Sequence, residues 1–287
     1  MSEIVVEVPA TAGYSEQWGD WAILRQPPAD TVVLDLSELQ FADPLFLLRM
    51  RGFIDWHCYN GHGVRVVRPQ SAQVRRYLSH MGLADELPER CVCEIAAAGT
   101  PTGSQILIPI RRLTSNEESD RLDDELATIL EAQFRGPLGR VAEAFTATAG
   151  EMCDNATTHG ASDVGFAYLS AQRYQQSRCV LAIGDLGIGI PDHIRRAFRE
   201  LVDDEDAIRV ATKEGVTATG RDHRRVGYQY AIDALKDSNV PRGELRVWSG
   251  RGRFRVEVRD GRQVRRDAWG VDGKTVGTWV RLELAVR

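Results

Sequence analysis

The sequence has few cysteines, no long apolar run and no excess of positive charge, and each absence excludes a class of protein. Its five cysteines show no paired zinc-type spacing, so neither a disulfide scaffold nor a zinc module is expected. No stretch approaches the ~18 apolar residues of a membrane-spanning helix. Acidic residues outnumber basic ones by 41 to 36, a formal charge of −5, which gives no reason to expect nucleic-acid or anionic-membrane binding.

The amino-terminal residues also lack the basic start and the apolar run of an export signal. Together with the odd number of cysteines, this predicts a soluble protein of the cytoplasm. The hydrophobic fraction of 43% is sufficient for ordinary buried cores. A length of 287 residues predicts two domains, at roughly 100–200 residues per domain.

The expected domain boundary is residues 96–104, which are rich in Gly, Thr and Pro and have no apolar period. We therefore predict a first domain over residues 1–95 and a second over residues 105–287. Both are expected to be α/β, because strand and helix patterns follow one another in each.

In the first domain, a β-branched run at 31–36 predicts a buried strand, and Pro44 suits the first turn of a helix over residues 44–59. The run VRVV at 64–67 predicts a second strand, and Ser71 could cap the helix after it. This alternation indicates a small α/β layer domain.

The second domain combines helical patterns with a carboxy-terminal β meander. Strands are expected at 106–110, 164–170 and 179–185, and helices at 117–134, 137–159, 192–200 and 226–237. From residue 244 onward, the pairs Asp260-Gly261 and Asp272-Gly273 are hairpin signals because both allow positive φ. We therefore expect a mixed or antiparallel sheet here.

The first group that could carry chemistry is EMCDNATTHG, residues 151–160. Near the end of a helix, Glu151 and Asn155 would share one face because they stand four residues apart. The amide oxygen of Asn155 could bind Mg²⁺, and Glu151 could deprotonate a hydroxyl or water that attacks a γ-phosphate. Taken alone this spacing is a weak signal, because a polar helical face is usually only solvated.

The second group is LAIGDLGIGIP, residues 181–191, in which an apolar strand leads into Asp185 and then into Gly187 and Gly189. Glycines two apart let the backbone approach a ligand where a Cβ would clash. A buried carboxylate at a strand end can accept a hydrogen bond from an exocyclic amine such as that of adenine. Asp-x-Gly-x-Gly is also common in turns, so this group too needs support.

In this order, the two groups resemble the N box and G1 box of the GHKL ATPase superfamily, which includes gyrase-type ATPases, MutL-type repair proteins, histidine kinases and anti-sigma-factor serine kinases. The Glu-x-x-x-Asn-x-x-x-His-Gly form is most similar to the anti-sigma serine kinases. The resemblance covers residues 105–287 and implies an α/β sandwich that binds ATP and Mg²⁺ under a mobile lid. It implies that Glu151 is the catalytic base and Asn155 the magnesium ligand.

The same resemblance implies the adenine end of the site. Asp185 would contact the base, and Gly187 and Gly189 would lie along the nucleotide. Near the end of the chain, VGTWVRLEL resembles the last strand of these domains, and the resemblance places the hydroxyl of Thr278 beside the adenine.

The phosphate loop departs from the family's pattern. In GRDHRRVGYQYAIDAL, residues 220–235, Gly227 matches the second glycine of the loop, but Arg225 replaces the first and Tyr228 replaces a leucine. Arg225 could supply positive charge to the triphosphate above a helix N-terminus. Alternatively, the loop is degenerate, and nucleotide is held weakly or is not turned over. Of these two, we favour a retained but altered phosphate site at Arg225 and Gly227.

Residues 31–83 resemble a STAS domain, the fold of anti-anti-sigma factors. Phosphorylatable relatives carry a serine at the start of the helix, whereas this chain has Asp43-Pro44-Leu45. The first domain therefore resembles a docking module that cannot be switched by phosphorylation at that place, and it could dock in cis on the second domain.

These patterns predict an ATP- and Mg²⁺-dependent regulatory protein, a serine/threonine kinase of the anti-sigma-factor type in which Glu151 activates a hydroxyl of a partner. Two alternatives stay open: a non-catalytic ATP-binding switch whose lid state controls partner binding, and a slow ATPase. The expected partner is a protein of STAS or sigma-factor type, and family analogy alone suggests a homodimer.

Overall fold

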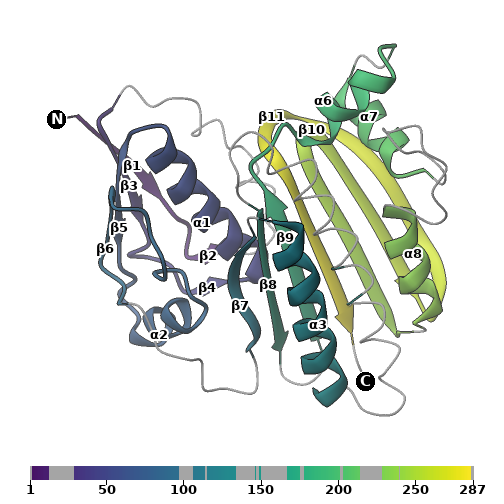
Figure 1. Ribbon diagram of the computed structural model, residues 1–287, viewed down its shortest axis with the longest axis horizontal. Coiled ribbons are helices and arrows are strands. Elements are labelled where there is room, and N and C mark those ends of the chain that lie inside the picture. Colours follow the sequence, from purple (N-terminus) through teal and green to yellow (C-terminus); the bar gives the residue numbers. More distant parts are fainter. Residues whose placement is uncertain are drawn as a thin grey trace.

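The computed structural model describes residues 2–12, 29–96, 106–113, 115–133, 146, 149, 167–174, 178–200, 203–213, 228–238 and 240–285. They form two β-sheets with associated helices (Figure 1). We call the described residues up to 96 the N-terminal unit and those from 106 onward the C-terminal unit. Within the described residues, no helix combines the length and the apolar character that crossing a membrane requires.

The N-terminal unit is built on a four-stranded parallel sheet with the order β1-β3-β5-β6. Its elements are β1 (Glu3–Glu7), β2 (Thr11–Ala12), β3 (Thr31–Asp35), β4 (Phe41–Ala42), α1 (Pro44–Tyr59), β5 (Gly63–Val67), α2 (Ala72–His80) and β6 (Cys91–Cys93). The predicted strands and the helix over residues 44–59 are confirmed. Ser71 caps α2 as expected, because its Oγ accepts from the backbone N–H of Val74 at 3.4 Å.

The C-terminal unit is built on a five-stranded antiparallel sheet with the order β10-β11-β9-β8-β7. Its elements are β7 (Ile106–Leu113), α3 (Asn116–Gln133), β8 (Ala167–Tyr174), β9 (Arg178–Asp185), α6 (Gly189–Ala197), α7 (Asp204–Ala211), α8 (Tyr228–Asp237), β10 (Arg242–Arg259) and β11 (Arg262–Ala285). The α/β class expected from the sequence is confirmed. The predicted helix 137–159 and nearly all of the predicted linker lie outside the described residues.

One of the two predicted hairpins is present and the other is wrong. Asp260 and Gly261 adopt φ values of 46° and 74° and join β10 to β11. Asp272 and Gly273 instead lie inside β11. The reason is that β10 pairs with β11 on both sides of them, so residues 271–274 form an irregularity in one long ladder. The region after Pro191 also contains α7, where the sequence indicated only one short helix.

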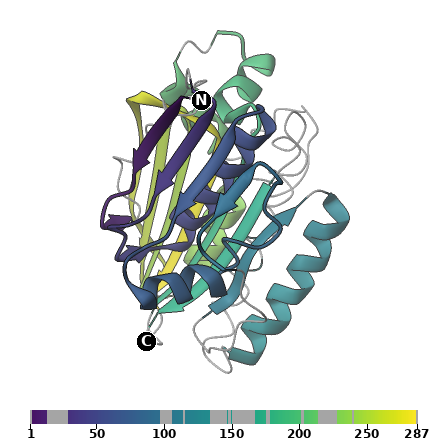
Figure 2. The same ribbon diagram turned by 90° about the vertical axis from the view of Figure 1, so that its left-hand side faces the viewer.

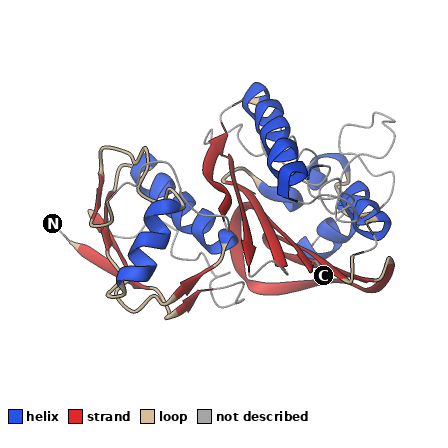
Figure 3. Cartoon of the chain, turned by 90° about the horizontal axis from the view of Figure 1, so that it is seen from below, coloured by secondary structure: helices blue, strands red, loops and turns tan. Residues whose placement is uncertain are grey.

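Helix α1 lies between the two sheets, as Figure 3 shows from below. It packs on β5 on one side and on β8, β9 and β11 on the other. Of its 16 residues, 14 are buried, as expected for a helix that is apolar on most of its circumference. Five side chains of the C-terminal unit join the apolar core around α1: Tyr168, Ala182, Leu186, Trp248 and Trp279. The two units therefore share one core.

The C-terminal sheet has two differently covered faces. Along β11, Val280, Leu282 and Leu284 belong to the core beneath the helices of the C-terminal unit, whereas Trp279 and Arg281 point toward α1. Figure 2 shows the parallel sheet in front of the antiparallel one. We call these sides the helix face and the α1 face. Because side chains alternate along a strand, neighbouring residues of one strand serve opposite faces.

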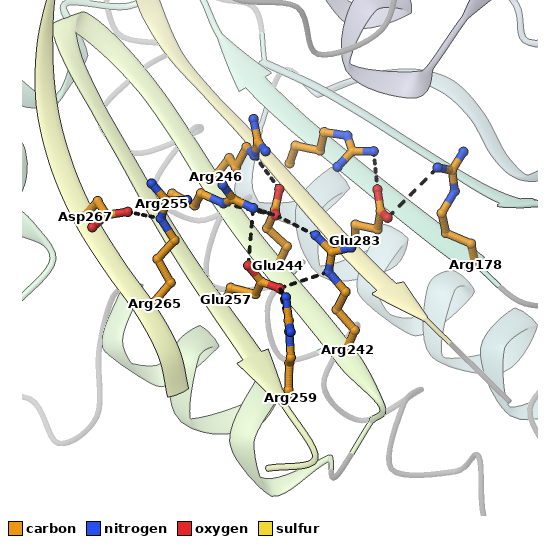
Figure 4. Close-up of polar contacts among 11 residues, drawn as sticks. Arg178, Arg242, Glu244, Arg246, Arg255, Glu257, Arg259, Arg265, Asp267 and Glu283 are labelled. Atoms are coloured by element: carbon orange, nitrogen blue, oxygen red, sulfur yellow. Dashed lines mark hydrogen bonds and ion pairs between the residues drawn. The ribbon is translucent and has the colours of Figure 1, made fainter. Parts of the chain in front are cut away.

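The α1 face also carries a network of ion pairs that is centred on β10, with further pairs on β11 (Figure 4). Glu244 and Glu257, each 5% exposed, lie at its centre and share Arg242 and Arg255. Each carboxylate also has a third arginine of its own. This dense pairing allows both carboxylates to be buried on an otherwise polar surface.

Candidate functional site

Asp185 and Thr278 lie opposite each other on β9 and β11. Directly paired residues of an antiparallel ladder project to the same face, and here that is the helix face. Asp185 is the last residue of β9 and is 4% exposed. Its Oδ1 accepts a hydrogen bond from the backbone N–H of Gly187 at 2.8 Å. The chain thus turns around its own carboxylate directly after the strand.

Burial raises the pKa of Asp185 to about 7, although hydrogen bonds from the backbone of Gly187 and Thr278 act in the opposite direction. Near neutral pH this carboxyl group is therefore divided between its charged and neutral forms. A ligand that donates a hydrogen bond to the oxygens favours the charged form. Asp185 is accordingly prepared to accept a hydrogen bond from a buried ligand.

Ser249 connects the parts of this site and was not identified from the sequence. It is fully buried at the end of the regular part of β10. Its Oγ accepts from the backbone N–H of Ile190 at 2.8 Å and donates to the carbonyl of Gly277 at 2.9 Å. A serine near the end of a strand pattern is too common to be distinctive, and its partners lie far away in the sequence.

The same serine fixes the proton of Thr278. The two hydroxyl oxygens are 3.1 Å apart. Because the single proton of Ser249 is directed at the carbonyl of Gly277, the Thr278 hydroxyl must donate to Ser249. This arrangement leaves the lone pairs of the Thr278 oxygen uninvolved in the network. They can accept a hydrogen bond from a ligand next to Asp185.

Two glycines allow these groups to approach one another. Gly189, at the start of α6, has φ = 82°, and a Cβ there would lie 2.8 Å from the Ser249 Oγ. Gly277 has φ = 67°, and a Cβ there would lie 1.9 Å from the carbonyl oxygen of Asp185. An L-residue would be strained and would clash at either position. The close contact between the α6 start, β10 and β11 therefore depends on glycine.

The structure thus brings together four of the predicted site residues: Asp185, Gly187, Gly189 and Thr278. The other four, Glu151, Asn155, Arg225 and Gly227, lie outside the described residues. Within the described part of the chain, no three His, Cys, Asp or Glu side chains cluster as they would around a metal ion.

A cavity of about 480 Å³ lies farther along the sheet, beside the first residues of α8. Three cations, Arg209, Lys213 and Arg266, line it together with one carboxylate, Asp267. Arg266 also donates to the carbonyl of Thr212. Arg209 is already paired with Glu205 and Asp206, so Lys213 and Arg266 are the cations of this cavity that could attract an anionic group.

Comparisons with known proteins give limited matches. No family model matches the sequence, and no curated protein matches it. The chain is similar to the topoisomerase IV ATP-binding domain of Francisella tularensis, solved with a small-molecule inhibitor, at 15% identity and a TM-score of 0.22, over 39% of this chain and 48% of that one. It is also similar to the B subunit of DNA gyrase from Myxococcus xanthus, at 16% identity and a TM-score of 0.22, over 39% of this chain and 28% of that one.

Proposed function

We propose that the C-terminal unit binds ATP, with the adenine base at Asp185 and Thr278. The observation that carries this proposal is a buried carboxylate, with its pKa raised to about 7, opposite a threonine hydroxyl whose proton is already donated to Ser249. The charged carboxylate and the Thr278 oxygen both accept hydrogen bonds. Adenine presents an amine at C6, whereas guanine presents an acceptor there that the carboxylate would repel. The site therefore prefers adenine.

The phosphate and metal ends of the site are proposed from the sequence alone. Asn155 would hold Mg²⁺ through its amide oxygen, with water and phosphate oxygens as further ligands. The bound Mg²⁺ would neutralise charge on the triphosphate. Arg225, near the start of α8, would add a fixed positive charge, and Gly227 would let the backbone approach the phosphates.

The reaction supported best by these residues is phosphoryl transfer to a serine or threonine of a protein partner, as in the anti-sigma-factor kinases. Glu151 would accept the proton of the partner's hydroxyl as the oxygen attacks the γ-phosphate. The altered loop at Arg225 favours the alternative that the protein binds ATP as a switch, or hydrolyses it slowly, and presents a different surface in each state.

The N-terminal unit does not lie where the phosphoacceptor of the proposed kinase would have to bind. Phosphorylatable STAS domains would carry the serine at the start of this helix, directly after Asp43, and Asp43 contacts Arg281 on the α1 face. The proposed nucleotide site lies on the helix face of the same sheet. A phosphoacceptor would therefore belong to a separate protein of STAS or sigma-factor type, and the STAS-like N-terminal unit would act as a permanent support.

Equilibrium binding of ATP and GTP to the full chain, with and without Mg²⁺, tests the nucleotide site. ATP is expected to bind more tightly than GTP, and Asp185→Asn is expected to reduce this preference. Asn155→Ala should weaken only the Mg²⁺-dependent part of ATP affinity. Equal affinity for both nucleotides, unchanged by Asp185→Asn, would show that no base contact exists.

Incubation with γ-labelled ATP and candidate STAS-domain proteins distinguishes the three activities. Label on the partner that disappears in Glu151→Ala supports the kinase. Free phosphate without labelled partner supports the slow ATPase, and binding without turnover supports the switch.

A further inference from the structure

We propose that the N-terminal unit is a positioning part of the adenine site: α1 holds the end of β9 and the part of β11 that carry Asp185 and Thr278, and thereby sets nucleotide affinity. This inference rests on the proposed function. It assigns to α1 a role in ligand binding, although α1 lies on the opposite face of the sheet from the ligand.

Because side chains alternate along a strand, each proposed base-contacting residue and its next neighbour in the chain lie on opposite faces of the sheet. Thr278 points to the helix face, and its neighbour Trp279 points to α1. Asp185 is followed by Leu186, which also belongs to the core around α1. Both neighbours are fully or almost fully buried. Each base-contacting residue is thus directly bonded to a residue that packs on the N-terminal unit.

Gly52, in the middle of α1, contacts both of these neighbours. A Cβ on Gly52 would lie 2.8 Å from a ring carbon of Trp279 and 3.3 Å from a methyl carbon of Leu186. Real Cβ atoms do not approach other atoms as closely as 2.8 Å, so the indole fits against α1 only because this residue is glycine. A movement of α1 toward the sheet would therefore push on the chain beside Asp185 and Thr278 at once.

Trp279 extends this contact to the rest of the turn. Its ring covers Gly184, the residue before Asp185, where a Cβ would lie 2.1 Å from the ring. Its Nε1–H donates to the carbonyl of Val276 at 2.8 Å. One buried side chain consequently fixes the residues on both sides of the proposed base contacts. In a close-packed interior, such a side chain transmits small shifts instead of absorbing them.

Polar contacts hold α1 in register on the sheet. The Tyr168 hydroxyl donates to Asp55 at 2.8 Å, and the Tyr168 ring stacks on Trp279 with an interplanar angle of 9°. Asp55 is itself paired with Arg51 at 3.0 Å. These groups are buried, so their pairing fixes the position of α1 more strictly than apolar contacts alone would.

The test compares two substitutions of the same kind in the full chain. Gly52→Ala adds a methyl group between α1 and Trp279, and Gly270→Ala adds one on β11 where the nearest atom is 3.9 Å away. Gly52→Ala is expected to weaken ATP binding at least fivefold, the lower end of the roughly 5- to 150-fold range of coupling between sites. Gly270→Ala is expected to bind ATP as the wild type does. Trp279→Phe, which removes ring atoms, should restore part of the ATP affinity when it is combined with Gly52→Ala.

Hydrogen exchange on the wild-type protein provides a second measurement that does not depend on a variant folding. Because coupling is reciprocal, ATP should slow amide exchange in α1, and GTP at the same concentration should slow it less. A Gly52→Ala protein that is folded and binds ATP normally would overturn the inference, as would α1 exchange that ATP leaves unchanged. A wild-type protein that binds no ATP at all would instead overturn the proposed function.

Discussion

Asp43 caps α1 with one carboxylate oxygen and accepts a hydrogen bond from Arg281 with the other. Oδ1 is 2.9 Å from the backbone nitrogen of Phe46, and Oδ2 is 3.0 Å from the Nε of Arg281. Both side chains of this ion pair are at most 3% exposed. The start of α1 and the last strand of the chain, 238 residues apart, are therefore joined by one buried contact.

Removing this carboxylate is expected to destabilise both units together. Asp43→Ala leaves Arg281 without one of its buried partners and α1 without a cap, at a cost of about 3–5 kcal/mol. Asp43→Asn should cost less because it retains the cap oxygen. Urea unfolding followed by circular dichroism measures both, and the shared core predicts a single transition.

An exposed ion pair provides the control for Asp43. Glu3 and Arg65 are 3.4 Å apart, with side chains 50% and 42% exposed. Glu3→Gln should therefore change the free energy of unfolding by less than about 1 kcal/mol. Separate unfolding of the two units, or equal costs for Glu3→Gln and Asp43→Ala, would contradict the shared core.

Asp185 predicts how stability and affinity depend on pH. Its folded-state pKa of about 7 lies above its usual 3.8. A raised pKa contributes stability that is fully present below about pH 4 and is lost as the pH rises through about 7. Asp185→Asn should therefore stabilise the nucleotide-free protein at pH 8, by about 2–4 kcal/mol given ~1.4 kcal/mol per unit of pKa.

ATP affinity should show the opposite trend. The adenine amine donates to the charged carboxylate, so ATP affinity should increase as the pH rises through about 7. The wild type and Asp185→Asn can be compared by thermal unfolding and by ATP titration at pH 5, 6, 7 and 8, a series chosen to span the pKa of about 7. Affinity for ATP that falls over this range would be incompatible with a base contact at Asp185.

The fold could largely be predicted from the sequence, and the proposed adenine site rests on residues whose sequence signals are also local. Pro44 and Ser71 mark helix starts by their own backbone and capping chemistry. Asp185 and Gly189 lie in the same short segment of the sequence, residues 181–191. The Asp272-Gly273 hairpin was predicted wrongly because a turn dipeptide says nothing of the partner strand, which here continues past it.

What could not be predicted depends on contacts between distant residues. The dual use of Asp43 as a helix cap and as the partner of Arg281 joins two segments 238 residues apart. Ser249 is a second example, because its three partners come from the start of α6 and from the interior of β11, far away in the sequence. A single sequence carries no periodic or local signal for such pairings.

Gly189→Ala separates backbone strain from the geometry of the site. Gly189 and Gly61 have similar φ values, 82° and 89°. A Cβ at Gly189 would meet the Ser249 Oγ at 2.8 Å, whereas a Cβ at Gly61 would meet nothing within 4 Å. Both alanine variants should lose about 1 kcal/mol of stability from the positive φ. Only Gly189→Ala should also weaken ATP binding, as isothermal titration would measure. Equal ATP affinity in the two variants would show that the α6 start is not part of the site.

Ser249→Ala tests whether the serine network positions Thr278. The substitution leaves the backbone N–H of Ile190 without its partner and frees the Thr278 hydroxyl to rotate, so that its proton can point at the ligand's amine. We expect a loss of about 1–3 kcal/mol in stability and a several-fold weaker affinity for ATP. Ser71→Ala is the matched control, because it removes a hydroxyl that caps α2 at a cost of about 1 kcal/mol and has no contact with the site. If both variants lose the same stability and neither loses ATP affinity, the network supports the fold alone. If only Ser249→Ala loses affinity, then a residue that makes no direct contact with the base controls the orientation of one that does.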